Sequence, residues 1–241
     1  NNKQYYKASP FKIGLSGGFN FSRLGVDHTD PWTYPILKID FEYSFDGTET
    51  EDILAFSFLF NFGYVGKGFI QKVTGIEGDP KFGGYVDADF LFFQASFKNK
   101  FVNFAGPFVP YLLLGLELNI FLSSSFNTDD PAYYVDGRPY YNFSYGFYPV
   151  SVSVLVGIGF EISIGIAGDI FLNLLYHIGI SDSVKDVNTY KDYNTEVEFQ
   201  TYKHFDSELE LVIGWKIGFD QIGNWFKKKD IKSSYFNNFS Y

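Results

Sequence analysis

Residues 150–162, VSVSVLVGIGFEI, carry the pattern on which the rest of the chain is built. Large apolar side chains occupy the even positions from Val150 to Ile162, and mostly small or polar side chains occupy the odd ones. A period of two predicts a β-strand, because successive side chains of a strand point to opposite faces. The alternation outlasts the roughly 5–6 residues of an ordinary strand and is long enough to cross a bilayer at a tilt.

Seven further segments repeat this alternation along the chain. They span residues 11–22, 36–45, 53–64, 85–97, 108–123, 169–181 and about 206–219. The connections after the first, third, fifth and seventh segments are long, and those after the second, fourth and sixth are shorter. This sorting is typical of a meander barrel with long loops at one end and short turns at the other.

We therefore predict an all-β fold, an eight-stranded antiparallel up-and-down transmembrane β-barrel over residues 11–219. The sheet should close, because an unpaired strand edge in hydrocarbon leaves backbone groups unsatisfied. Residues 1–10 form a leader and residues 220–241 a tail. Short turns face the periplasm in such barrels, so both termini are expected on the periplasmic side of the outer membrane.

The polar rows of these strands should fill the barrel interior. They comprise Lys12, Lys38, Asp40, Glu42, Asp87, Asp89, Glu117, Glu161, Asp169, His177, Glu208, Glu210 and Lys216. An eight-stranded interior has room for its own side chains or one small ligand, which favours a packed polar core over an ion or proton path. Because carboxylates outnumber lysines, several should lie near a rim, bind a cation or be protonated.

The composition narrows the classes of protein that remain. Aromatic residues make up 22% of the chain, with 30 Phe and 19 Tyr, which fits a lipid-facing barrel. The chain lacks Cys, so disulfides and zinc–thiolate sites are excluded, and we expect no metal or cofactor. No apolar run is long enough for a transmembrane helix. The net charge of −9 argues against nucleic acid as a partner.

Two segments stand out as surfaces for other proteins. The loop over residues 128–148 is rich in aromatic residues around one arginine, and these residue types are enriched at binding hot spots. The alternative is an aromatic belt at the headgroups and a loop packed on itself. The tail combines apolar and lysine residues as in a short amphipathic helix, with a disordered extension as the alternative. The partner-binding candidates are Tyr133, Tyr134, Arg138, Tyr140, Tyr141, Trp225, Phe226, Tyr235 and Phe236.

Several strands resemble those of PorT-like outer-membrane β-barrels, which are common in Bacteroidota. The similar segments are KIGLSGGFNFSRL (residues 12–24), PYLLLGLELNIFLSSS (110–125), VLVGIGFEI (154–162), FLNLLYHIGISD (171–182) and ELVIGWKIGF (210–219). The resemblance implies a small eight-stranded barrel without enzymatic activity, and some relatives are linked to protein secretion machinery. The chain departs from the family pattern by continuing beyond Phe219.

From these patterns we expect a non-enzymatic outer-membrane barrel that contacts lipid and acts as a structural or accessory subunit, together with other outer-membrane or periplasmic proteins. One alternative is a small integral-membrane enzyme or ligand-binding barrel that uses Asp27, His28 and Asp30, or His177 with interior carboxylates. His204 is the remaining histidine. Another alternative, a soluble lipocalin-like barrel, is disfavoured because apolar rows on every strand would overfill its cavity.

Overall fold

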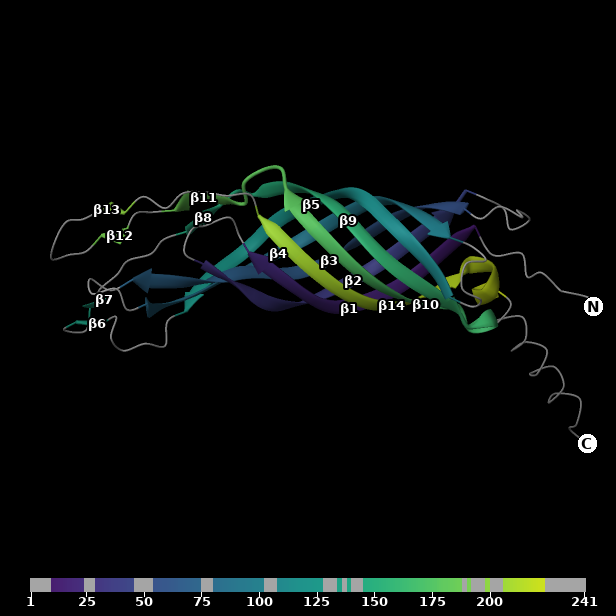
Figure 1. Cartoon of the computed structure of the whole chain (residues 1–241), viewed down its shortest axis with the longest axis horizontal. Helices are drawn as coiled ribbons and strands as arrows, with labels where there is room; N and C mark the ends of the chain where they lie inside the picture. The colour runs from purple at the N-terminus through teal and green to yellow at the C-terminus, as the bar shows by residue number, and fades with distance from the viewer. Residues whose placement is uncertain are drawn as a thin grey trace, which may run out of the picture.

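The structure of the protein is a computed structural model. It describes residues 10–23, 29–45, 54–74, 80–101, 108–127, 134–135, 138–139, 145–187, 190–191, 198–199 and 206–223. The main body is a closed barrel whose strands run β1-β14-β10-β9-β5-β4-β3-β2 around the wall, each antiparallel to its neighbours (Figure 1). This confirms the predicted eight-stranded antiparallel up-and-down barrel.

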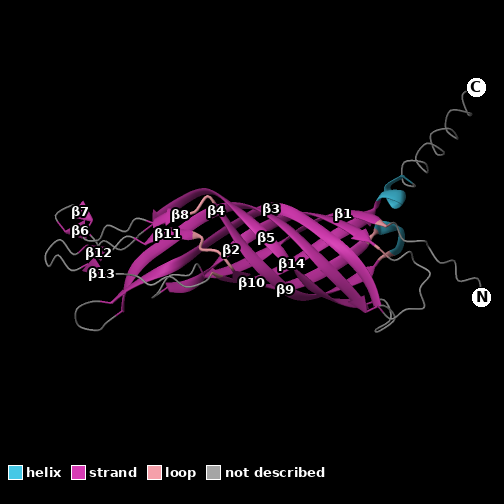
Figure 2. Cartoon of the chain, turned by 90° about the horizontal axis from the view of Figure 1, so that it is seen from above, coloured by secondary structure: helices cyan, strands magenta, loops and turns pink. Residues whose placement is uncertain are grey.

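The strands of the wall differ in length. They are β1 (Phe11–Arg23), β2 (Thr29–Ser44), β3 (Leu54–Thr74), β4 (Pro80–Phe101), β5 (Phe108–Asn127), β9 (Val150–Ser163), β10 (Asp169–Gly179) and β14 (Ser207–Gly218). Short two-stranded ribbons lie beyond one end of the barrel (Figures 1 and 2). They are formed by β6 (Tyr134–Val135) with β7 (Arg138–Pro139), β8 (Tyr145–Phe147) with β11 (Val184–Val187), and β12 (Tyr190–Lys191) with β13 (Glu198–Phe199).

The first and last strands close the barrel by pairing with each other. Their register runs without a break from Lys12 opposite Gly218 to Arg23 opposite Ser207. The start of β1 and the end of β14 therefore lie at the same end of the barrel, which we call the terminal end. The opposite end, which carries the ribbons, is called the ribbon end.

Strand β9 shows how the alternation in sequence becomes an inside and an outside. Its odd-numbered side chains face the interior, where Ser151, Ser153, Leu155 and Glu161 are buried. Its even-numbered side chains face outward, and Ile158 keeps 56% of its surface exposed. The polar row therefore lies inside and the apolar row outside, as the sequence predicts.

The strands β2 to β5 are longer than the sequence pattern predicts. Residues 65–74, expected in a loop, continue β3, and β4 extends through Lys98 and Lys100 to Phe101. Only residues 24–28 separate β1 from β2, and only residues 75–79 separate β3 from β4. The expected long connections after the first and third strands are therefore wrong. The long connections are those between β5 and β9 and between β10 and β14.

The expected orientation of β4 is also wrong toward the ribbon end. Asp87 and Asp89 were expected inside, but Val86, Ala88, Phe90 and the residues that continue their row are the buried ones. The hydroxyl of Tyr64, an exposed residue, donates to the Asp89 carboxylate. Both aspartates therefore lie on the outer face of the wall.

The connection between β9 and β10 is a tight turn, in agreement with the shorter connection that the sequence predicts at this point. It contains the 3₁₀ turn η2 (Gly165–Ala167), and the amide of Gly168 donates to the carbonyl of Gly165 at 3.1 Å. Gly165 and Gly168 have φ angles of 71° and 98°, a region that side chains with a Cβ rarely adopt. After β14, residues 219–223 form a helical turn at the terminal end (Figure 2). No helix among the described residues is long and apolar enough to cross a membrane.

Candidate functional site

The barrel interior gathers most of the charged residues that the sequence places there. Those lying inside are Lys12, Lys38, Asp40, Glu42, Glu117, Glu161, Asp169, His177, Glu208, Glu210 and Lys216. Three buried lysines were missed, Lys67, Lys98 and Lys100, because the sequence pattern assigns them to connections. With these lysines added, and Asp87 and Asp89 moved outside, each of these interior carboxylates except Asp40 has a cation in contact, and Asp40 accepts a hydrogen bond from the Asn61 amide.

Five side chains form a closed ring across the interior, which we call the cross-barrel ring: Lys38, Gln94, Glu117, His177 and Glu210. Lys38 contacts Glu210 and donates to the Gln94 amide oxygen at 3.2 Å, and Gln94 donates to Glu117 at 2.6 Å. The His177 ring lies between the two glutamates, with Nδ1 3.3 Å from Glu117 and Nε2 3.4 Å from Glu210. Strands β2, β4, β5, β10 and β14 are thereby joined through side chains.

A second set of contacts extends this ring toward the ribbon end. Lys67 on β3 lies 3.3 Å from Glu117 and 2.5 Å from Glu208, and Asn20 on β1 donates to Glu208 at 3.1 Å. Beside it lies an apolar layer of buried residues, to which Phe121 and Phe147 contribute partly buried rings. The layer consists of Ile36, Val65, Ala88, Phe90, Phe92 and Val212. The interior at this end is therefore filled as well.

A separate group of ion pairs lies nearer the terminal end, and we call it the lower cluster: Glu42, Lys98, Lys100, Glu161 and Lys216. Each glutamate contacts all three lysines; the Lys98–Glu161 and Lys100–Glu161 distances are 2.6 Å and 3.0 Å. Buried charges are costly unless paired, and every charge in this cluster has opposite charges in contact.

The pair of Lys12 and Asp169, 2.6 Å apart, lies beyond the lower cluster. Lys12 is on β1 and Asp169 begins β10, and both side chains are slightly exposed. This pair occupies the end of the interior where the first and last strands meet, so ion pairs continue from the cross-barrel ring to the terminal end.

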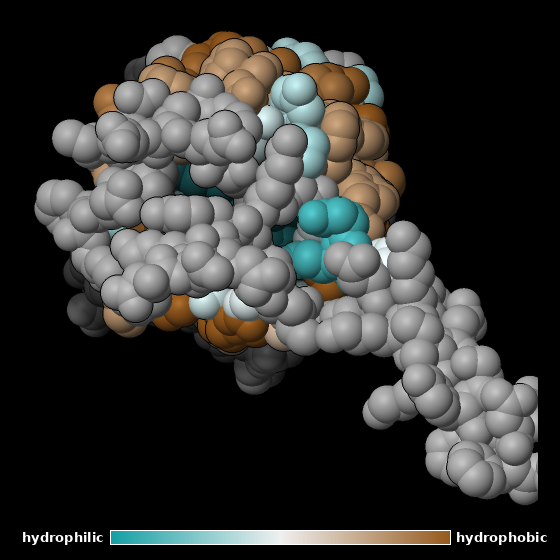
Figure 3. Space-filling view, turned by 90° about the vertical axis from the view of Figure 1, so that its right-hand side faces the viewer, coloured by the Kyte–Doolittle hydropathy of each residue, from teal (hydrophilic) through white to brown (hydrophobic). Residues whose placement is uncertain are grey.

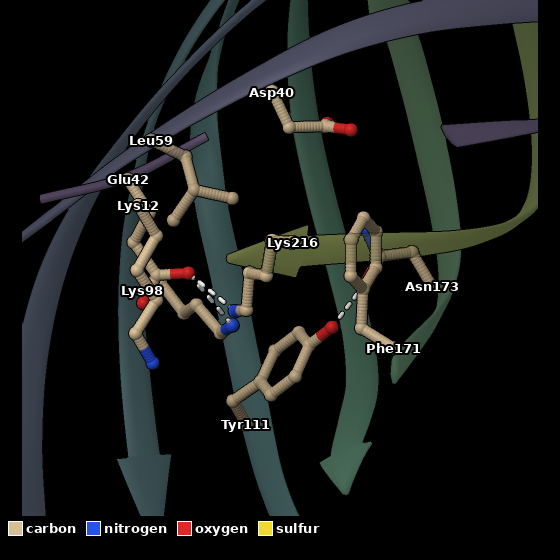
Figure 4. Close-up of a pocket in the computed structure, with 9 residues that line it drawn as sticks. All are labelled: Lys12, Asp40, Glu42, Leu59, Lys98, Tyr111, Phe171, Asn173 and Lys216. Atoms are coloured by element: carbon tan, nitrogen blue, oxygen red, sulfur yellow. Dashed lines mark hydrogen bonds and ion pairs between the residues drawn. The ribbon is translucent and has the colours of Figure 1, made fainter. Parts of the chain in front are cut away.

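Tyr111 packs beside the lower cluster and fills the space next to it (Figure 4). The ammonium of Lys98 lies 3.8 Å from the centre of the Tyr111 ring, which is a cation–π contact. The Tyr111 hydroxyl donates a hydrogen bond to the side-chain oxygen of Asn173. A Cβ added at Gly159, the residue opposite Tyr111 on β9, would lie 2.5 Å from this ring. The ring therefore fits against β9 because Gly159 has no side chain.

The cavity that remains here is too small for a substrate. Its volume is about 10 Å³, and Figure 4 shows the residues that surround it. Roughly 10–15 Å³ is the space that one water molecule needs. The interior can hold a water at this point, whereas small-molecule sites commonly measure about 300–1,000 Å³.

Glu117, His177 and Glu210 offer ligand atoms within 4.8 Å of one another and are the cluster best suited to a metal among the described residues. However, the Lys67 and Lys38 ammonium groups already contact the two carboxylates. The two ring nitrogens of His177 also face different glutamates, at 3.3 Å and 3.4 Å. This geometry fits a salt-bridge network better than a metal site.

The outer surface contrasts with this polar interior. Large apolar residues are exposed on all eight strands, among them Leu15, Leu37, Phe60, Phe93, Leu116, Ile158, Leu174 and Ile213. In Figure 3, which views the barrel end-on, hydrophobic residues gather around the circumference. An exposed apolar surface of this extent is unfavourable in water, and it is what acyl chains require.

The predicted partner-binding residues are placed only in part. Tyr134 and Arg138 lie in the ribbon of β6 and β7, where Val135 pairs with Arg138. Tyr133, Tyr140, Tyr141, Trp225, Phe226, Tyr235 and Phe236 lie outside the described residues. Partner binding by these side chains stays a prediction.

Of the two residue sets of the enzymatic alternative, the described structure brings together His177 with interior carboxylates but places only part of the other set. Asp27, His28 and His204 lie outside the described residues, and Asp30 lies in β2 opposite Ile70. His177 is fully enclosed, at 1% exposure, between Glu117 and Glu210. A substrate therefore has no described route to this imidazole.

Among known proteins, the chain is similar to several solved structures of outer-membrane proteins. No family model and no curated protein matches the chain. Neisserial surface protein A is 16% identical, with 89% of this chain and 100% of that chain covered and a TM-score of 0.49. OprG from Pseudomonas aeruginosa is 14% identical (88% and 98% covered, TM-score 0.45), and Ail of Yersinia pestis is 13% identical (87% and 99% covered, TM-score 0.40). Ail is an attachment invasion locus protein, and OprG is an outer membrane protein.

Proposed function

We propose that the protein is a non-enzymatic outer-membrane barrel that acts as a structural or accessory subunit, of the PorT-like type that its strand sequences resemble. Its partners are other outer-membrane or periplasmic proteins. The observation that carries this proposal is the filled interior. The cross-barrel ring and the lower cluster occupy the lumen, and the cavity beside the lower cluster has room for about one water.

A barrel closed in this way is suited to neither diffusion nor catalysis on a small molecule. Ions that cross the interior would have to break salt bridges between groups that are 1–9% exposed. Removing one partner of a buried pair costs about 3–5 kcal/mol, so this barrier is substantial. The remaining surfaces for function are the two ends and the lipid-facing wall.

The outer membrane is supported by the combination of polar interior and apolar exterior. Barrels are the way in which β-strands cross a bilayer without unsatisfied backbone groups. We place the terminal end in the periplasm, since the tight turn at residues 164–168 lies there and short turns face that side in such barrels. The ribbon end, with its long connections, then faces outward.

Two measurements test this proposal. In planar lipid bilayers, the purified full chain should give no stable conductance steps above those of protein-free membranes. Gentle detergent extraction from native membranes should recover the chain with a defined set of outer-membrane or periplasmic proteins. Stable large conductance would contradict the closed interior. If crosslinking in intact cells recovers the chain without any partner, the subunit role is contradicted.

A further inference from the structure

The exposed apolar residues on the outer faces of the eight strands form a band around the barrel, which we call the belt. The wall formed by β2 to β5 continues beyond this belt toward the ribbon end, where its outer face becomes polar. On the outer face of β4, the apolar row of Phe93 and Leu91 gives way to Asp89, Asp87 and then Tyr85. At roughly 3.3 Å per residue and a tilt of about 40°, six residues rise about 15 Å above Leu91. This outer wall therefore spans the depth of a headgroup layer next to the belt.

Two aromatic rings form a platform on this part of the wall. The rings of Trp32 on β2 and Tyr85 on β4 lie nearly parallel, with 14° between their planes and 6.0 Å between their centres. Trp32 keeps 41% of its surface exposed. Tyr and Trp are suited to positions where an apolar face and a hydrogen-bonding group are both needed.

Two carboxylates are held in position beside this platform. The Tyr34 hydroxyl donates to Asp87, and the Tyr64 hydroxyl donates to Asp89. The Ser123 hydroxyl also donates to Asp89, at 2.9 Å. A carboxylate accepts about four hydrogen bonds, so the two donors at Asp89 leave it capacity for hydroxyl groups of a ligand.

We propose that this strip, consisting of Trp32, Tyr85, Asp87 and Asp89, binds the sugar headgroup of an outer-leaflet glycolipid. The inference rests on the proposed function, because it places the belt in the outer membrane and the ribbon end outside. The strip continues the belt on the same strands, so the acyl chains of one lipid lie on the belt while its headgroup reaches the strip. Sugar hydroxyl groups donate to carboxylates and apolar sugar faces stack on aromatic rings, whereas phosphate groups would be repelled by the two aspartates.

The test uses the intact chain in detergent micelles and measures lipid binding by native mass spectrometry. The probes are rough lipopolysaccharide, which carries core sugars, and lipid A, which carries the phosphates but lacks the core. We expect the full chain to bind the former at least fivefold more tightly. Trp32→Ala and Asp89→Asn should each reduce that preference at least threefold.

Matched variants at the terminal end serve as controls. Tyr43→Ala removes an aromatic residue that is 38% exposed, and Asp220→Asn removes an exposed carboxylate; neither should change the preference. Equal binding of both lipids by the full chain would overturn the proposal, as would loss of binding with a chelator, which would indicate phosphate contacts bridged by divalent cations. The filled lumen is tested independently by the conductance measurement, so the two proposals can fail separately.

Discussion

At the scale of single residues, Lys38 shows how the interior is held closed. Its ammonium contacts Glu210 and Gln94, and so joins two neighbours in the cross-barrel ring. We predict that Lys38→Met lowers the free energy of unfolding by about 3–5 kcal/mol, because Glu210 loses the cation bonded to it while remaining buried. Urea unfolding in lipid vesicles measures this loss.

A double-mutant cycle separates the ion pair from general damage to packing. Glu210→Gln in the Lys38→Met background should restore part of the stability, with a coupling energy of about 1 kcal/mol or more, because no unpaired charge is left at that position. Strictly additive losses would show that Lys38 and Glu210 are not an energetic pair.

Gly159 provides a second prediction at this scale. A Cβ at Gly159 would lie 2.5 Å from the Tyr111 ring and 2.6 Å from a backbone oxygen of β10, so Gly159→Ala should destabilise the barrel by about 1–3 kcal/mol. Gly17→Ala is the matched control, since its nearest neighbour would be at 3.3 Å and the expected cost is smaller. Thermal unfolding of the two variants side by side provides the measurement, and equal melting temperatures would count against the close fit of Tyr111 and Gly159.

At the scale of elements, β4 carries neighbouring phenylalanines with opposite roles. Phe92 is fully buried in the apolar layer, with the Lys38 ammonium 5.3 Å from its ring centre, whereas Phe93 is 37% exposed on the outer face. Phe92→Ala should cost about 3–5 kcal/mol, as is usual for a cavity in a packed core. Phe93→Ala should cost less than half as much, because lipid can fill the space. Unfolding in vesicles compares the two, and a larger loss for Phe93→Ala would reverse the assigned faces of β4.

The same strand explains what sequence reasoning could and could not predict. The period of two places alternate residues on opposite faces, but it does not say which face is inside. Assuming that polar residues point inward works for β9, with Ser151 and Glu161. It fails for Asp87 and Asp89, because beyond the belt the outer face meets polar surroundings and the interior is packed with Phe90 and Val86.

Strand ends were the other source of error. Lys67 lies in YVGKGF between two glycines, which have no side chains to show an alternating pattern. Lys98 and Lys100 lie between Phe97 and Phe101, and this alternating stretch is too short to be recognised as part of a strand. The closed topology was predictable because long alternation on eight segments allows few arrangements. The cross-barrel ring was not, because which lysine meets which glutamate depends on register between strands distant in sequence.

At the scale of the whole molecule, the opposition between a charged interior and an apolar exterior is what assigns the barrel to a membrane. Leu116 lies at a central outward position of β5 and is 54% exposed, while Leu122, near the ribbon end of the same strand, is 49% exposed. Their exposure is similar, so a soluble barrel would accept a charge at either position. In a bilayer the cost of a charge depends on its depth.

We therefore predict that Leu116→Arg destabilises the protein in lipid vesicles by about 2–4 kcal/mol, whereas Leu122→Arg costs about 0–1 kcal/mol. Urea titration of both variants in vesicles measures the difference. Both variants should fold equally well in detergent, because detergent molecules rearrange around a charge more easily than a bilayer does. The two residues match in strand, face and residue type and differ in depth, although Leu122 also lies where the register between β4 and β5 shifts. Equal costs for the two arginines in vesicles would mean that the exposed rows do not lie across a bilayer, and the closed polar interior would then have to be explained for a barrel that packs against protein.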